Sequence, residues 1–155
     1  KFYDILNAFE EGDKMTTLIQ KLSKRRCLTI HEYKNIKKAV KKLTLHGIGA
    51  LPVRNNLGEI VGIISERDIV KRLHTKKSRI FSSKVGSIMT KPVISCSVNA
   101  RANELMETMT KNKIRHIPIM ENKQLLGIVS IGDVVSRLFE KYRTEAQFMK
   151  DYINS

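Results

Sequence analysis

The chain has 155 residues, a length that fits one compact domain or two small ones. Apolar residues make up 41% of it and Trp is absent, so any core has to be built mainly from aliphatic side chains. No apolar run approaches the roughly 20 residues that a membrane-spanning helix needs, and the first residues do not resemble a signal peptide. Two cysteines, Cys27 and Cys96, provide neither a disulfide framework nor a metal-binding spacing, which predicts a reducing compartment, the cytoplasm.

The net charge of +14 is distributed unevenly along the chain. Residues 1–84 hold 19 Lys and Arg against 8 Asp and Glu, whereas residues 85–155 hold 10 against 7. A positive field of this kind attracts polyanions, which include nucleotides, nucleic acids and acidic membrane surfaces. The charge by itself does not choose among these partners.

The first half of the chain predicts a flanking helix at residues 1–17 and then the order strand, helix, strand, strand, helix. The central helix is indicated by apolar residues at i, i+3, i+4 and i+7, which share one helix face: Ile36, Ala39, Val40 and Leu43. We expect the strands at residues 27–30, 50–53 and 60–65. A turn with Asn and Gly at residues 54–58 separates the last two, and the final helix begins near Glu66.

The second half predicts the same order about 66 residues later. The apolar face of its helix is formed by Ala102, Leu105, Met106 and Met109. We expect strands at residues 93–96, 116–120 and 125–130, and a helix from near Gly132. Residues 139–155 extend that helix or add another, with Tyr142, Phe148, Met149 and Tyr152 as the apolar side.

The two halves are an internal repeat, which decides the architecture. Residues 62–73 read GIISERDIVKRL and residues 127–138 read GIVSIGDVVSRL, with seven of twelve positions identical. The predicted organisation is a flanking helix (1–17), repeat 1 (18–75), a basic linker (76–84), repeat 2 (85–142) and a C-terminal helical extension (143–155). A unit of about 60 residues buries little surface alone, so we expect an α/β (α+β) fold in which two βαββα units bury their sheet faces against each other.

The residues shared by the repeats resemble those of the CBS domain family, named for cystathionine β-synthase. They are the hydrophobic strands around Pro52 and Pro118, the strands that begin with Gly and end in Ser, and an Asp three residues after that Ser. The resemblance covers about residues 18–142. It implies two repeats packed about a pseudo-twofold axis, and pairs that associate into disc-like homodimers. We expect the helix face with Val70 and Leu73 to be covered in such a dimer.

The resemblance also implies a function. CBS pairs are non-catalytic sensors of AMP, ADP, ATP, S-adenosylmethionine or NAD, and they often regulate an enzyme or channel. We therefore expect this chain to bind an adenine nucleotide in the cleft between its repeats, to require no cofactor, and to act on a partner that the sequence does not name.

The recurring Ser-x-x-Asp pairs allow two interpretations. Ser65 with Asp68, and Ser130 with Asp133, can be helix caps, because Ser is a good N-cap and Asp suits a helix N-terminus. Geometry alone favours the cap, but the recurrence of the pair in both repeats favours a ligand site, because a carboxylate can accept both ribose hydroxyls while the helix N-terminus binds phosphate. The resemblance implies ribose and phosphate contacts at these positions.

Two sites follow from the resemblance, each with groups from both repeats. The first combines Ser65, Arg67, Asp68, Ser95, Arg115, His116, Ile117 and Pro118. The second combines Ser130, Asp133, Thr29, Gly49, Ala50 and Leu51. The first site is favoured, because Arg67, Arg115 and His116 can hold phosphate where the second offers Gly and Ala.

The alternative function is nucleic-acid binding by a basic face, although the sequence shows no recognisable nucleic-acid motif. This face comprises Lys37, Lys38, Lys41, Lys42, Lys71, Arg72, Lys76, Lys77, Arg79 and Lys84. An enzymatic function is not favoured. The four histidines lack metal-ligand spacing, and the sequence contains neither a nucleophile elbow nor a P-loop. A metal site is likewise not expected.

Overall fold

The computed structural model describes residues 27–154, so the helix expected at residues 1–17 lies outside the described part. The chain divides into two compact units. Within the described part, one unit holds residues 27–95 and 122–125, and we call it the N-terminal unit. The other holds residues 96–121 and 126–154, and we call it the C-terminal unit.

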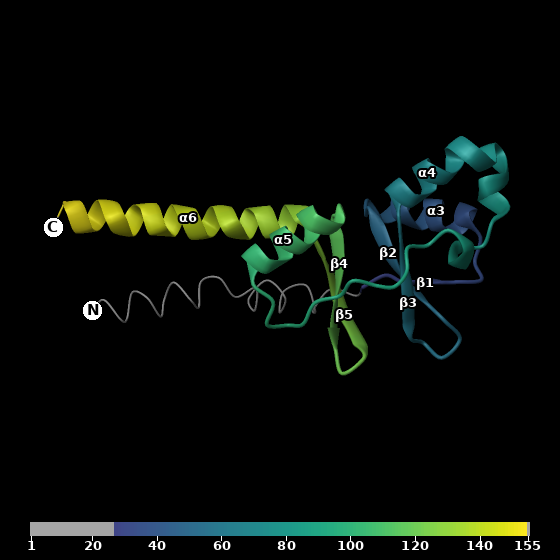
Figure 1. Ribbon diagram of the computed structural model, residues 1–155, viewed down its shortest axis with the longest axis horizontal. Helices are drawn as coiled ribbons and strands as arrows, with labels where there is room; N and C mark the ends of the chain where they lie inside the picture. The colour runs from purple at the N-terminus through teal and green to yellow at the C-terminus, as the bar shows by residue number, and fades with distance from the viewer. Residues whose placement is uncertain (1–26, 155) are drawn as a thin grey trace. The chain divides into compact units, whose positions relative to one another are not determined.

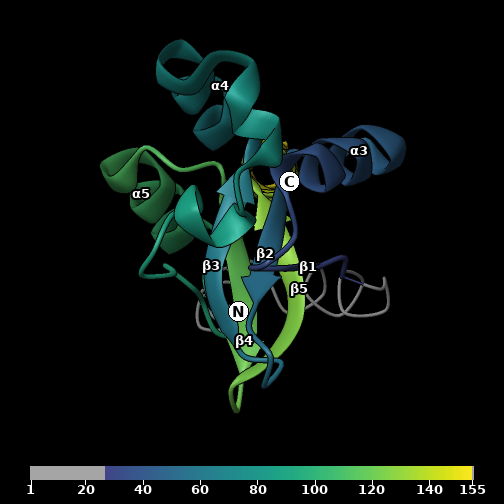
Figure 2. The same ribbon diagram turned by 90° about the vertical axis from the view of Figure 1, so that its right-hand side faces the viewer.

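The N-terminal unit has a three-stranded sheet in the order β1-β2-β3. Its elements are β1 (Ile30–His31), α3 (Ile36–His46), β2 (Ala50–Arg54), β3 (Ile60–Ser65), α4 (Glu66–Lys76) and the 3-10 helices η1 (Lys77–Ser82) and η2 (Val85–Ser87). Strand β1 runs parallel to β2, and β2 runs antiparallel to β3. Helix α3 packs against β2 and helix α4 against β3 (Figures 1 and 2).

The C-terminal unit repeats the helix, strand, strand, helix order. Its elements are α5 (Ala102–Asn112), β4 (His116–Glu121), β5 (Gln124–Ser130) and α6 (Ile131–Ile153), and β4 pairs with β5. Helix α6 is continuous from Ile131 to Ile153, so residues 139–153 extend the last helix of the repeat and do not form a separate helix (Figure 1). None of the described helices is long and apolar enough to cross a membrane.

The prediction of a strand at residues 93–96 is wrong, because this segment forms no strand in the structure. Only Cys96 pairs, through a single parallel bridge to Ile119. Its N–H donates to the carbonyl of Pro118 at 3.0 Å, and its carbonyl accepts from the N–H of Met120 at 2.9 Å. The first strand is likewise shorter than expected, at Ile30–His31. Ile30 and His31 pair with β2, and Cys96 alone pairs with β4. Both segments are this short because the chain then turns away toward the following helix.

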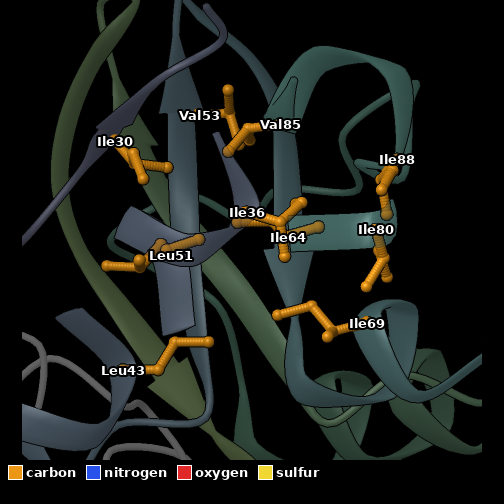
Figure 3. Close-up of a cluster of buried hydrophobic side chains, with 11 residues drawn as sticks. Ile30, Ile36, Leu43, Leu51, Val53, Ile64, Ile69, Ile80, Val85 and Ile88 are labelled. Carbon is orange, nitrogen blue, oxygen red and sulfur yellow. The ribbon is translucent and has the colours of Figure 1, made fainter. Parts of the chain in front are cut away.

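The core of the N-terminal unit is aliphatic, as the composition predicts (Figure 3). It contains Ile30, Ile36, Ala39, Leu43, Leu51, Val53, Ile64, Ile69, Ile80, Val85 and Ile88. Three of these come from α3 and confirm its predicted apolar face. Ile80 lies in the segment expected to be a linker, and it is fully buried here, so this segment packs on the unit.

The core of the C-terminal unit is smaller and is built on the same plan. It contains Ala100, Ala102, Leu105, Met109, Ile117, Ile119, Val129 and Val134. Ala102, Leu105 and Met109 confirm the predicted apolar face of α5. Only the first turns of α6 join this core, through Val134 and the half-buried Ile131 and Leu138.

Candidate functional site

Ser65 and Asp68 form a closed capping box at the start of α4. Ser65 ends β3, and its Oγ accepts the Asp68 backbone N–H at 3.4 Å. In return, Oδ2 of Asp68 accepts the Ser65 N–H at 2.8 Å and the Ser65 hydroxyl at 2.7 Å. The helix-cap interpretation is therefore confirmed for this pair. The cap uses one of the two carboxylate oxygens.

Ser130 and Asp133 form the same box at the start of α6. Oδ2 of Asp133 accepts the Ser130 N–H and hydroxyl, both at 2.7 Å, and the Asp133 N–H donates to Ser130 Oγ at 3.3 Å. Both Asp side chains are half-buried. The sequence repeat is thus a repeat of local hydrogen-bonding geometry, with each carboxylate held in one orientation.

The two carboxylates differ at their second oxygen. Oδ1 of Asp68 accepts the hydroxyl of Thr90 at 2.9 Å. Thr90 is fixed beside β3, because its N–H donates to the carbonyl of Ile63 at 2.8 Å and its carbonyl accepts the Ile63 N–H at 3.1 Å. Within residues 27–154, no corresponding donor reaches Oδ1 of Asp133. Sequence reasoning missed Thr90, because it is 22 residues from Asp68 and outside the recurring motif.

The first residue of α4 and the first residue of α6 are each hydrogen-bonded to the residue that directly precedes β2 or β4 in the same unit. The N–H of Glu66 donates to the carbonyl of Gly49 at 3.1 Å, and the N–H of Ile131 donates to the carbonyl of Arg115 at 2.9 Å. The structure therefore brings Ser65 and Asp68 together with Gly49 and Ala50, which pairs with Ser65 in the sheet. The sites predicted from the sequence instead combine the capping box of one repeat with the residues before the strand of the other repeat. That pairing stays a prediction.

The remaining predicted contact residues fall into two groups. Exposed or half-buried are Thr29, Arg67, Ser95, Arg115 and His116. The second group is buried and contains Leu51, Ile117 and Pro118. A ligand therefore meets the second group through backbone atoms only. The carbonyl of Thr29 accepts the Lys42 ammonium at 2.7 Å, which holds this strand entry in place.

The basic face belongs to the N-terminal unit. Its exposed members are Lys37, Lys38, Lys41, Lys71, Arg72, Lys77, Arg79 and Lys84, while Lys42 and Lys76 are half-buried. Lys84 lies over the ring of Tyr33, with its Nζ 5.3 Å from the ring centroid. The other exposed Lys and Arg side chains lie along α3, α4 and η1, where they produce a positive surface.

The two cysteines do not have the character of nucleophiles. Burial raises the pKa of the Cys27 thiol and raises the pKa of the Cys96 thiol to about 11. At neutral pH both are protonated, and the thiolate is the reactive form. The described residues also contain no cluster of His, Cys, Asp or Glu with the arrangement of a metal site.

Two surface hollows lie away from the predicted contact residues. One hollow is lined by residues of α5 between Met106 and Asn112, and another by residues of α6 between Glu140 and Asp151. Each is lined by a single helix and contains none of the predicted contact residues. The candidate site therefore rests on the capping boxes and their neighbours.

Comparison with known proteins identifies the repeat. A model of the CBS domain matches residues 19–75 and again residues 85–140. The CBS domain-containing protein CBSX3, mitochondrial, from Arabidopsis thaliana is 40% identical over 120 residues, which cover 74% of this chain and 58% of that protein. The chain thus spans little more than half the length of this relative.

Solved structures share the fold. The CBS-domain containing protein ATU1752 from Agrobacterium tumefaciens has a TM-score of 0.76 and 36% identity, over 80% of this chain and 92% of that one. The CBS domain pair of protein MJ0100, in complex with 5'-methylthioadenosine and S-adenosyl-L-methionine, has a TM-score of 0.66 and 32% identity, over 75% and 90%.

Proposed function

This chain belongs to the CBS domain family, and on that premise we propose that it is a regulatory CBS pair that binds an adenosine-containing ligand. The observation that carries the proposal is the capping box that occurs in both units, with each carboxylate fixed at a helix N-terminus. The crystallised MJ0100 pair, which is similar over most of its length, was solved with two adenosine derivatives.

The chemistry of the boxes fits a nucleotide. Each carboxylate keeps an oxygen outside its cap, and a carboxylate oxygen accepts hydrogen bonds from ribose hydroxyls. The first backbone N–H groups of α4 and α6 and the positive ends of their dipoles favour phosphate. We expect the ligand to be AMP, ADP or ATP, because Arg67, Arg115 and the net charge of +14 favour an anion.

We assign the stronger site to Asp68. In this assignment Asp68 and Ser65 bind ribose, with Arg67 near phosphate, and the opposite repeat contributes Arg115 and His116. The second site, with Asp133, Ser130, Thr29, Gly49 and Ala50, lacks those cations and takes a ligand with less negative charge. The occupied Oδ1 of Asp68 weakens this preference, whereas the exposed guanidinium of Arg115 supports it.

The first prediction concerns the two carboxylates. Asp68→Ala is expected to weaken nucleotide binding about tenfold to a hundredfold, because charge-assisted hydrogen bonds contribute about 1.5–3 kcal/mol. Asp133→Ala is expected to weaken it less. Titration calorimetry with adenosine, AMP, ADP, ATP and S-adenosylmethionine measures both effects.

A matched control separates binding from helix capping. Asn35 caps α3 outside the predicted sites, and its side-chain oxygen accepts the Lys38 N–H at 3.0 Å. Asn35→Ala is expected to cost about 1 kcal/mol of stability, like the loss of another N-cap, without altering ligand affinity. If both Asp variants bind every ligand as well as the parent does, the boxes are caps only and the proposed function fails.

The second prediction concerns phosphate. Arg115→Ala is expected to reduce the affinity for ATP and ADP more than that for adenosine, because its guanidinium acts on phosphate. Arg54→Ala, an exposed Arg at the end of β2, is the control. A double-mutant cycle of Arg115→Ala with Asp68→Ala in calorimetry tests the crosswise pairing. Losses that fall on two separate binding events, rather than on the same one, would contradict a shared site.

Polyanion binding is the second candidate function, and the observation that favours it is the exposed basic face on α3 and α4.

The expectations on catalysis, compartment, oligomeric state and partner stay proposals as well. We propose a non-catalytic role because the family match consists of two CBS repeats, and a reducing compartment such as the cytoplasm because both cysteines are free. The name of the Arabidopsis relative places that protein in mitochondria. A disc-like homodimer and a regulated protein partner are implied by the family.

A further inference from the structure

Helix α6 continues past the repeat with a regular apolar stripe. The family match ends at residue 140, whereas the helix continues to Ile153. Along α6, apolar residues recur with alternating spacings of four and three: Val135, Phe139, Tyr142, Ala146, Met149 and Ile153. This spacing has a period of 3.5 residues and places all six on one face of a helix.

This stripe is not the face that α6 packs on its own unit. The core contacts come from Val134, which is fully buried, and from Ile131 and Leu138. The large members of the stripe are exposed instead: Val135 39%, Phe139 68%, Tyr142 58%, Met149 70% and Ile153 79%. Ala146, at its centre, is exposed as well. The helix therefore carries a second apolar face that its own unit leaves uncovered.

We propose that this stripe pairs with the same stripe of a second copy of the chain, as a parallel two-stranded coiled coil. In heptad terms, Phe139, Ala146 and Ile153 occupy position a, and Val135, Tyr142 and Met149 occupy position d. The small side chain of Ala146 permits close approach at the centre. Knobs-into-holes packing then covers both stripes along the outer half of α6.

The flanking charges determine the orientation. In this register Arg143 and Lys150 occupy position e, and Glu145 occupies position g. A parallel pair places each g residue opposite the e residue of the next heptad on the partner helix. Glu145 of each copy therefore lies opposite the oppositely charged Lys150 of the other copy. An antiparallel pair would place e against e, which brings Arg143 and Lys150 against like charges. A parallel pairing with a second copy therefore satisfies both the apolar pattern and the charges.

The experiment compares two exposed aromatic residues of α6. Tyr142 and Phe148 are each 58% exposed, but Phe148 lies outside the stripe. Sedimentation equilibrium of the full chain is expected to show a dimer that Tyr142→Gln weakens about tenfold or more, because buried aromatic residues dominate interface energetics. Phe148→Gln is expected to leave the dimer unchanged. Circular dichroism confirms that both variants keep the helix.

A charge exchange tests the parallel orientation. Glu145→Lys or Lys150→Glu alone brings like charges together and is expected to weaken the dimer, and the double exchange is expected to restore it. A monomeric parent chain, equal effects of the two Gln variants, or a double exchange no better than the single ones would overturn the proposal.

Disulfide trapping distinguishes a second copy from another occupant. In a Cys27→Ser, Cys96→Ser background, Ala146→Cys is expected to oxidise to a covalent dimer, whereas Thr144→Cys, exposed but outside the stripe, remains monomeric. A monomer whose introduced thiol at position 146 resists alkylation would assign the stripe to residues 1–26 of the same chain and would overturn the proposal. Nucleotide binding by Tyr142→Gln reports on the ligand site separately.

Discussion

At the scale of single residues, Thr90 distinguishes Asp68 from Asp133. Both Asp side chains close a capping box through Oδ2, but only Asp68 also accepts a hydroxyl from a described residue at Oδ1. A ribose hydroxyl that approaches Oδ1 of Asp68 has to share that oxygen with Thr90 or displace it. The strength of the first site therefore depends on a residue that lies outside the Ser-x-x-Asp motif.

The third prediction follows from this contact. Thr90→Val is expected to raise nucleotide affinity about twofold to tenfold, because a neutral hydrogen bond contributes about 0.5–1.5 kcal/mol and the variant frees Oδ1 for the ligand. Calorimetry measures the change, and Thr75→Val, which removes an exposed hydroxyl bonded to the Arg72 carbonyl, is the control. An affinity loss of the same size would show instead that Thr90 orients Asp68 for binding.

At the scale of elements, the helix ends show where the repeats differ. Helix α3 ends at Gly47, with φ of 58°, and α5 ends at Lys113, with φ of 54°. Both residues are left-handed C-caps whose N–H groups satisfy carbonyls of the last turn. Repeat 1 therefore uses glycine, for which this conformation carries no steric penalty, and repeat 2 accepts the strain of a side chain.

The fourth prediction uses two glycines. A Cβ added at Gly47 meets no atom within 4 Å, so Gly47→Ala is expected to destabilise the fold by about 1 kcal/mol through backbone strain alone. Gly132 lies in the first turn of α6, where an added Cβ only touches Ser130 Oγ at 3.6 Å. Gly132→Ala is therefore expected to stabilise, by up to about 1 kcal/mol. Urea unfolding measures both, and changes of equal sign would contradict the argument.

Helix α6 shows how far periodicity alone can place side chains. The sequence groups Tyr142, Phe148, Met149 and Tyr152 as one apolar side. In the continuous helix, Phe148 lies away from the stripe that contains Tyr142 and Met149, because 3.6 residues make one turn. The heptad register follows from the tertiary structure, because α6 is one uninterrupted helix through Ile153.

At the scale of the whole molecule, the basic face gives the fifth prediction. Replacing Lys37, Lys38 and Lys41 by Gln is expected to weaken binding to a short single-stranded RNA and to reduce its salt dependence, because fewer counterions are released. Binding of the nucleotide ligand is expected to change little. Fluorescence anisotropy at two salt concentrations measures the first, and calorimetry the second. If the parent chain does not bind RNA at low salt, the basic face is only a solvated surface.

The sequence by itself determined the repeat, the family, the apolar faces of α3 and α5, and the residues of both capping boxes. These features are local: a helix face follows from spacing within eleven residues, and a Ser-x-x-Asp cap closes within a single turn. Only the tertiary structure decided that the segment around Ile80 packs in the core, that the strand at residues 93–96 reduces to Cys96, and that Thr90 reaches Asp68. Each of these depends on segments far apart in the chain meeting in space, and such a contact has no fixed spacing from which the sequence could reveal it.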